Sequence, residues 1–294
     1  MPAPDSTTTP AVPVSKPRDD EIDVHGLTHP GKTRPDNQDH FLICALRKQM
    51  VVQLSSLPDA AELNAGGERL AFLAMVADGV GGGAKGGEAS RVALEAVTHY
   101  VSSSMHCYYA AGSADDQQFY DALQAGALES HQELLRRGEE DADYRGMATT
   151  LTLFLGAWPR AYLLQVGDSR CYLLRHGELA QLTRDQTMAQ ELVDAGVMPA
   201  ELAATTRLAH TLSSSIGGRQ TDPKVTRLDM DWGHVVLLCS DGLIRHVSDD
   251  RIREVLRSMT SAKQACEILL QEALDGGGSD NITIVVGRAV RRQP

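Results

Sequence analysis

Two apolar runs in this 294-residue chain each end in an Asp-Gly dipeptide, and this feature most restricts how the chain can fold. Residues 72–77 precede Asp78-Gly79, and residues 235–239 precede Ser240-Asp241-Gly242. One such dipeptide alone would indicate a turn. Both runs, however, are apolar enough to be buried strands, and a carboxylate at the end of a buried strand is costly unless a cation or hydrogen bonds compensate it. The fold therefore has to supply that compensation.

The two dipeptides belong to a wider set of Asp-centred clusters at predicted strand ends or in adjoining loops, over residues 34–39, 78–82, 143–150, 240–243 and 276–281. Carboxylate oxygens without a His or Cys cluster favour Mg²⁺ or Mn²⁺ over zinc. Two such ions about 3.5–4 Å apart lower the pKa of a shared water, so that hydroxide can attack phosphorus at neutral pH. Gly79 can offer its carbonyl to a metal, and the planar guanidinium of Arg34 can hold a phosphate group by two parallel hydrogen bonds.

Charge and composition exclude several other classes of partner. The chain has 28 Lys and Arg against 39 Asp and Glu, which gives a formal net charge of -11. An acidic surface repels phosphate backbones and anionic lipid headgroups, so we expect neither nucleic acid nor a membrane as partner. The N-terminal residues lack the basic and apolar regions of an export signal, which predicts a cytoplasmic protein.

Period-two and helical patterns predict an α+β chain. Strands are expected over residues 69–76, 149–156, 160–166, 170–175, 234–240 and 281–287. Helices are expected over 88–103, 117–137, 249–259 and 261–274, with Ser248 as an N-cap. Residues 149–156 and 160–166 should form an antiparallel hairpin across a Trp-Pro turn. Residues 1–20 are predicted to be a disordered tail, residues 21–290 one domain, and residues 291–294 a C-terminal tail.

In their order and spacing, the motifs resemble those of the metal-dependent serine/threonine phosphatases of the PP2C (PPM) family, and most closely its compact bacterial members. The resemblance runs from about Val24 to Arg288. It rests on Arg34-x-x-Asn37-x-Asp39, Asp78-Gly79-x-Gly81-Gly82, Met147-x-Thr149-Thr150, Gly167-Asp168-Ser169-Arg170, Leu182-Thr183-x-Asp185, Ser240-Asp241-Gly242-Leu243 and Asp280-Asn281. It implies a central β-sandwich of two antiparallel sheets flanked by helix pairs, an α-β-β-α arrangement. The implied activity is hydrolysis of phosphoserine and phosphothreonine in proteins by direct attack of a metal-bridging hydroxide.

The resemblance also implies roles for the carboxylates. Asp78 would bridge two ions, Mn²⁺ or Mg²⁺, and Gly79 would give its carbonyl to the second ion. Asp241 and Asp280 would bind the first ion. Asp39 would bind through metal-held water.

Further roles follow from the same resemblance. Arg34 would bind the phosphate group. Asp143 would join Asp241 in holding a third, weaker metal, as in bacterial members. Gly167-Asp168-Ser169-Arg170, in contrast, is interpreted as a structural turn in which Asp168 forms local hydrogen bonds.

The chain departs from the family pattern at three informative positions. Gln38 stands where many members have Glu, which predicts weaker binding of the second ion. Val80 stands where some eukaryotic members have a His proposed as general acid, so the acid is unassigned here. Gln186 replaces the usual His, a change that removes no predicted ligand. Residues 185–218 correspond to the variable flap beside the active site, where substrates could be discriminated.

Two functions other than phosphatase activity are also compatible with parts of the sequence. Residues 81–86 formally satisfy G-x-G-x-x-G, but Asp78 would face the pyrophosphate and no second βαβ unit follows, so nucleotide binding is not favoured. The other alternative is a non-catalytic phosphatase-like module that binds phosphoproteins, which the presence of all four ligand aspartates disfavours. As an enzyme, the protein would act on phosphoproteins opposite a cognate serine/threonine kinase. A monomer is expected, because no heptad pattern is sustained.

Overall fold

Strand β3 (Glu68–Ala77) is buried on both faces along most of its length, and this explains the unbroken apolar sequence of residues 70–77. Successive side chains of a strand point to opposite faces. Leu73 and Met75 join the core formed with helices α1 (Ala84–Ala110) and α2 (Asp116–Glu140). Ala74 and Val76 join a second core that lies between two sheets. The computed structural model describes residues 15–48, 67–81, 84–110, 116–203 and 205–291.

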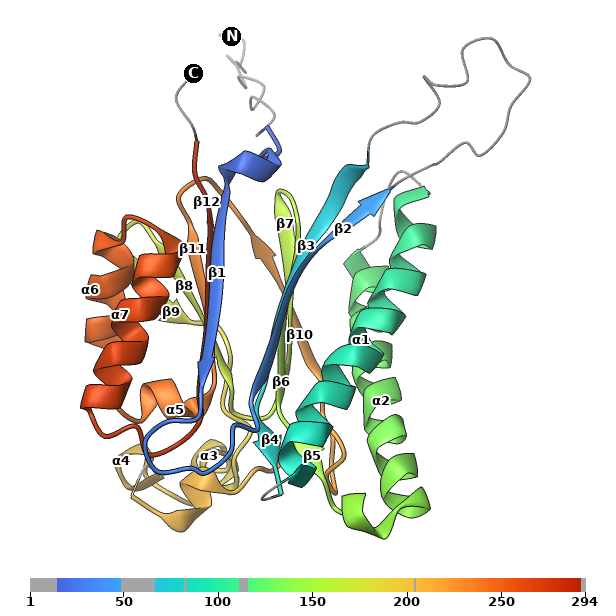
Figure 1. Ribbon diagram of the computed structural model, residues 1–294, viewed down its shortest axis with the longest axis vertical. Helices are drawn as coiled ribbons and strands as arrows, with labels where there is room; N and C mark the ends of the chain where they lie inside the picture. The colour runs from blue at the N-terminus through green and yellow to red at the C-terminus, as the bar shows by residue number, and fades with distance from the viewer. Residues whose placement is uncertain (1–14, 49–66, 82–83, 111–115, 204, 292–294) are drawn as a thin grey trace, which may run out of the picture.

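Two antiparallel sheets of five strands each form the centre of the described chain (Figure 1). In the first, the order is β1 (Ile22–His29), β12 (Ile282–Ala289), β11 (Val235–Cys239), β8 (Arg170–Arg175) and β9 (Glu178–Gln181). In the second, the order is β10 (Lys224–Asp229), β7 (Arg160–Val166), β6 (Leu151–Ala157), β3 and β2 (His40–Lys48). The short strands β4 (Gly79–Val80) and β5 (Ala148–Thr149) pair beside them.

Helices cover the outer face of each sheet (Figure 1). Helices α1 and α2 pack against the second sheet. Helices α6 (Asp249–Ser258) and α7 (Ala262–Asp275) pack against the first, together with the short α5 (Asp241–Ile244). The flap region contains α3 (Met188–Asp194), α4 (Ala200–Ala203) and a 3₁₀ turn over Arg207–His210. These four layers confirm the expected sandwich with outer helix pairs.

The main differences from the predicted elements are at the sheet edges and in helix lengths. The sequence patterns did not indicate β1, β2, β9 and β10, all four of which lie at sheet edges. Ser248 caps α6 as predicted, and Ser261 proves to be the N-cap of α7 rather than its first residue. Leu135 is 38% exposed, because the buried stripe of α2 passes through Ser130 and Leu134.

Strand β1 begins and strand β12 ends at the end of the sandwich opposite α5 (Figure 1). Residues 16–19 were placed in the tail by composition, yet they contact β3. The Lys16 ammonium donates to the Arg69 carbonyl, and the Arg69 guanidinium donates to the Pro17 carbonyl and pairs with Asp19 at 2.7 Å. Residues 1–14 lie outside the described part, so the prediction of a disordered tail there stays a prediction. None of the described helices has the length and apolar character needed to cross a membrane.

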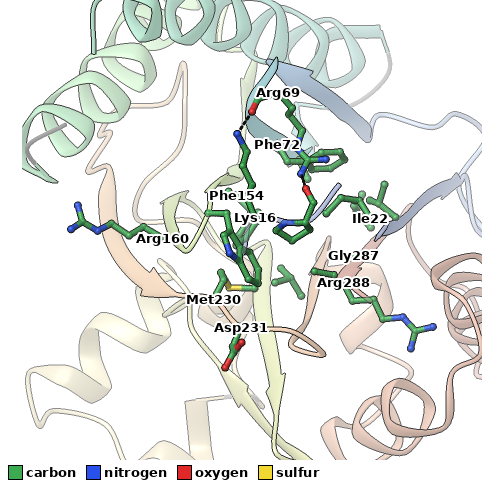
Figure 2. A pocket seen from close by; sticks show the side chains of 18 of the residues that line it. Lys16, Ile22, Arg69, Phe72, Phe154, Arg160, Met230, Asp231, Gly287 and Arg288 are labelled. Carbon is green, nitrogen blue, oxygen red and sulfur yellow. Dashed lines mark hydrogen bonds between the residues drawn. The ribbon is translucent and has the colours of Figure 1, made fainter. Parts of the chain in front are cut away.

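An apolar cavity of about 100 Å³ lies between the two sheets at this end. Figure 2 shows Phe72, Phe154 and Met230 among the side chains that line it, with Lys16 and Arg69 at its edge. It has no cluster of carboxylates, so the predicted chemistry has to be sought at the other end.

Candidate functional site

Strand register brings the predicted carboxylates to the end of the sandwich where α5 lies (Figure 1). In the second sheet, His40 pairs with Ala77, so Asp39 and Asp78 lie next to the ends of two neighbouring strands, at the same end of the sheet. In the first sheet, Cys239 pairs with Ile284, which places Asp241 and Asp280 at the corresponding end of that sheet. Residues far apart in the sequence are thereby gathered into one site.

Asp39 connects the two sheets. Its Oδ2 accepts hydrogen bonds from Ser240 Oγ at 2.7 Å and Thr283 Oγ1 at 2.8 Å, both from the opposite sheet. Its Oδ1 is buried without a hydrogen-bond partner among the described residues. Burial raises the pKa of Asp39 to about 6, although the two hydroxyl donors act in the opposite direction. An unpartnered buried carboxylate oxygen of this kind calls for a cation or a bound water.

Asp78 lies at the centre of the group. Its backbone is held by Thr150, whose Oγ1 accepts from the Asp78 amide at 3.0 Å and whose amide donates to the Asp78 carbonyl at 2.9 Å. Burial raises the pKa of Asp78 well above its ordinary value, and the charges of four other carboxylates, Asp39, Asp241, Asp168 and Asp280, raise it further. A buried carboxyl group surrounded by other carboxylates is the kind of group that a bound cation compensates.

Gly79 has to be glycine because β4 passes very close to the start of α1. A Cβ atom at this position would lie 2.1 Å from the carbonyl oxygen of Gly86. The next residue, Val80, is 42% exposed and carries no proton that could be donated to a leaving group. The general acid therefore remains unassigned at this position, as the sequence indicated.

Asp168 belongs to the site although the sequence was interpreted as a structural turn there. It is 9% exposed, and burial together with the charges of Asp241 and Asp185 raises its pKa to about 8. Gly167, at φ +99°, makes the turn, since a Cβ atom there would lie 2.7 Å from Thr150 Cγ2. Gln186 Oε1 accepts from the Gly167 amide at 2.7 Å. The available signal was that Asp168 follows the apolar strand β7 just as Asp78 follows β3.

Two arginines contact the carboxylates. Arg34 forms a two-pronged pair with Asp280, with Nε 2.9 Å from Oδ1 and Nη2 2.9 Å from Oδ2, rather than with its neighbour Asp36. Arg245, which the motifs did not single out, lies just after α5. Its Nε donates to Asp241 Oδ2 at 3.0 Å, and its Nη2 is 3.7 Å from Asp280 Oδ2. The four-residue spacing from Asp241 on a helix could have revealed it.

Asn281 organises the loop that carries Arg34. Its side-chain amide donates to the carbonyls of Pro30 at 3.0 Å and Asp36 at 2.9 Å, and its Oδ1 accepts from the Gln38 amide at 2.9 Å. The Asp280-Asn281 motif thus supplies a carboxylate and, in the next residue, the support for the loop opposite it.

Asp143 is not joined to the group by any interaction among the described residues. It is exposed in the 3₁₀ turn Ala142–Tyr144, where its amide donates to the Asp141 side chain at 2.9 Å. Its predicted role beside Asp241 stays a prediction.

The charges and donor types fit a divalent cation. In the described residues no three His, Cys, Asp or Glu side chains stand ready to hold one ion. Arg34 and Arg245 engage oxygens of Asp280 and Asp241 in this arrangement. The buried Asp39 Oδ1 without a hydrogen-bond partner fits a bound cation, and so do the carboxylate charges that, together with burial, raise the pKa of Asp78. An all-oxygen set suits Mg²⁺ or Mn²⁺.

Comparison with known proteins agrees with this chemistry. Residues 56–276 match the family model described as protein phosphatase 2C. The chain is 35% identical to the serine/threonine protein phosphatase PstP of Mycobacterium tuberculosis over 83% of its own length and 46% of that protein. It therefore spans about half the length of this relative. It is also 29% identical to the serine/threonine phosphatase stp of Listeria monocytogenes, over 73% of this chain and 83% of that one.

The catalytic domain of PstP, solved in complex with two manganese ions, superimposes with a TM-score of 0.67 at 31% identity, over 92% of this chain and 99% of that one. The match of the family model covers most of the chain, and the sheets and outer helices agree with the structural match to the PstP catalytic domain. The chain belongs to the protein phosphatase 2C family.

Proposed function

We propose that this chain hydrolyses phosphoserine and phosphothreonine in proteins and uses Mn²⁺ or Mg²⁺ to do so. The observation that carries the proposal is Asp78, whose carboxyl group faces four other carboxylates in a site that also holds Arg34. The names of the relatives support the substrate class, and the two manganese ions of the PstP catalytic domain support the cofactor.

The residues that would hold the ions are Asp78, Asp241 and Asp280, with the Gly79 carbonyl and, through water, Asp39. Bound ions would lower the pKa of a water molecule, so that hydroxide becomes available for attack on phosphorus at neutral pH. Asp168, whose pKa responds to the charge of Asp241, is a candidate ligand for a further ion, beside the earlier candidate Asp143.

The chain's own groups then position the substrate. Arg34 has a side chain that is 55% exposed, so it can turn from Asp280 to a phosphate group without unpacking the core. Its fork of donors fits two phosphate oxygens and would neutralise charge that develops during attack. The unpartnered Oδ1 of Asp39 can accept a hydrogen bond from the attacking water and so orient it. Thr149 Oγ1 and the Thr150 amide both donate to the Asp78 carbonyl, at 2.8 and 2.9 Å, and fix its backbone.

Phosphate release from a phosphothreonine peptide tests the proposal. The chain is stripped of metal with a chelator, Mn²⁺ is titrated back, and wild type is compared with Asp241→Asn. Activity should return in wild type and stay at least about a hundredfold lower in the variant, because a ligand carboxylate is lost. Asp229→Asn, at an exposed position of β10, is the matched control and should behave as wild type. Peptide binding without hydrolysis in every protein would support the non-catalytic module instead.

Further parts of the proposal concern the cellular setting. The proposed domain comprises residues 21–290 and acts as a monomer in the cytoplasm, on proteins phosphorylated by a serine/threonine kinase. The phosphatase names of the relatives support a phosphoprotein substrate. Gel filtration, and phosphoprotein profiles of cells with and without the protein, would test these points.

A further inference from the structure

Arg245 is a cation inside a group of carboxylates that are proposed to bind metal. Its Nε donates to Asp241 Oδ2 at 3.0 Å, its Nη2 contacts the same oxygen, and Nη2 is also 3.7 Å from Asp280 Oδ2. The side chain is partly buried, and although burial acts to lower its pKa, the charges of Asp241, Asp280 and Asp168 raise the pKa above its ordinary value. Arg245 therefore stays charged beside these carboxylates.

Arg245 contacts Oδ2 of Asp241 and lies 3.7 Å from Oδ2 of Asp280, and these two aspartates are the ones proposed to bind the first ion. A guanidinium and a divalent ion cannot occupy the same lone pairs, and two positive charges a few ångströms apart repel each other strongly where water is partly excluded. An ion that binds Asp241 through Oδ2 therefore has to displace Arg245.

We propose that Arg245 is a built-in counter-cation that competes with divalent ions for Asp241 and Asp280 and so lowers the metal affinity of the chain. This inference rests on the proposed function, because it assumes that these aspartates are ligands. In metal-free protein Arg245 offsets part of the carboxylate repulsion. Metal binding releases it toward the open side of the site, so the affinity for metal includes the cost of breaking the pair.

Arg245 differs in this respect from Arg34. Arg34 lies in a loop, is 55% exposed and pairs with Asp280 alone among the ligand aspartates. Arg245 follows directly on the four-residue helix α5 that Asp241 begins, so this single turn keeps the two residues together. The competition is therefore expected to be stronger for Arg245.

The test is calorimetric titration of Mn²⁺ into the full, chelator-stripped chain, with no substrate present. Arg245→Gln should bind Mn²⁺ at least about tenfold more tightly than wild type, because the competing charge is gone. Arg245→Lys should fall between them, since it keeps the charge but loses the planar fork. Arg227→Gln is the matched control: Arg227 also pairs with two carboxylates, Asp116 and Asp229, but at a distance from the site, and its loss should leave the affinity unchanged.

Circular dichroism and thermal unfolding show whether each variant is folded, and Arg245→Lys keeps the test valid if Arg245→Gln is not. Equal or weaker Mn²⁺ binding by the folded Arg245 variants, with clear binding by wild type, overturns this inference and leaves the proposed function intact. No Mn²⁺ binding by any of the proteins overturns both.

Discussion

The two ends of the β-sandwich are built from the same strands, but one end buries apolar side chains and the other brings carboxylates together. At the end where β1 begins and β12 ends, Phe72, Phe154 and Met230 line an apolar cavity between the sheets (Figure 2). The charged groups there are paired, as Arg69 is with Asp19 and Arg288 with Asp23. The other end, which we call the acidic end, holds Asp39, Asp78, Asp168, Asp241 and Asp280. Burial and mutual repulsion there raise the pKa of Asp39, Asp78 and Asp168.

One strand can contribute both to the core between the sheets and to the acidic end. Strand β11 contributes Val236 and Leu238 to the core between the sheets and leads directly into Ser240 and Asp241. The apolar part of the strand contributes stability, because it removes apolar surface from water. The acidic end reduces the stability of the metal-free chain, because it holds like charges together. Function and stability should therefore separate along the strand.

The largest expected effect is that of Asp78→Asn. The proposed phosphatase activity should fall at least about a hundredfold, because the carboxylate at the centre of the site is lost. In a chelator, however, the variant should unfold at a higher temperature than wild type, because the repulsion from four carboxylates is relieved. Initial rates with Mn²⁺ and thermal unfolding in chelator measure the two. A loss of stability as large as the loss of rate would contradict the proposed separation.

Phe154→Ala should show the opposite pattern. Phe154 lines the apolar cavity and packs against the core between the sheets, so its removal should lower the free energy of unfolding by roughly 2–4 kcal/mol. The turnover number with Mn²⁺, measured well below the melting temperature, should stay within about twofold of wild type. Phe154→Leu is the matched control and should cost less. A fall in turnover comparable to that of Asp78→Asn would show that the two ends are not independent.

The stability of the metal-free chain should depend on pH through the acidic end. Asp39 and Asp168 have pKa values raised to about 6 and about 8, so they favour the folded state when protonated. Their contribution is complete below their ordinary pKa and is lost as the pH rises through these values. The melting temperature in chelator should therefore fall by several degrees between about pH 5 and pH 8. Mn²⁺ should reverse this fall, because it binds the deprotonated carboxylates. A pH-independent melting temperature would contradict the pKa assignments.

Most of the strands and helices, and the positions of Asp78 and Asp241 at strand ends, could be predicted from the sequence for identifiable reasons. Strands such as β3 and β11 are buried on both faces and are recognisable as apolar runs, and Asp78 and Asp241 follow them directly. The strands β1 and β10 escaped prediction because their residues are only partly buried, which leaves a weak pattern. Position at a sheet edge reduces the apolar signal that sequence reasoning depends on.

Residues whose role depends on distant partners were missed for a different reason. The local sequence around Asp168 indicates only a turn, because Asp241, whose charge raises the pKa of Asp168, lies 73 positions later in the printed sequence. Arg245 escaped because no motif includes it, although the spacing from Asp241 is local. Asn281 was noted only as part of a motif, and its support of the Arg34 loop emerges from contacts with Pro30 and Asp36. Such roles follow from the arrangement of the loops in space.

The smallest expected effect comes from Gln38→Glu, which adds a carboxylate at the acidic end. Gln38 is held by its backbone, whose amide donates to Asn281 at 2.9 Å and whose carbonyl accepts from Ser90 at 2.6 Å. Its side chain reaches the start of α1, since a Cβ atom on Gly86 would lie 2.2 Å from Gln38 Oε1 and 2.8 Å from the Gly79 carbonyl. The new carboxylate would therefore lie beside the Gly79 carbonyl that is proposed to bind the second ion.

We expect Gln38→Glu to lower the dissociation constant for Mn²⁺ by about threefold to tenfold, because an additional negative charge attracts the ion. The same charge should lower the melting temperature in chelator, since it adds to the repulsion around Asp78. Calorimetric titration and thermal unfolding measure both, with Gln124→Glu on α2 as the matched control. If Gln38→Glu binds Mn²⁺ no more tightly than Gln124→Glu, the amide at this position does not weaken metal binding. The affinity of the acidic end for Mn²⁺ would then be limited by Arg245 rather than by a missing carboxylate.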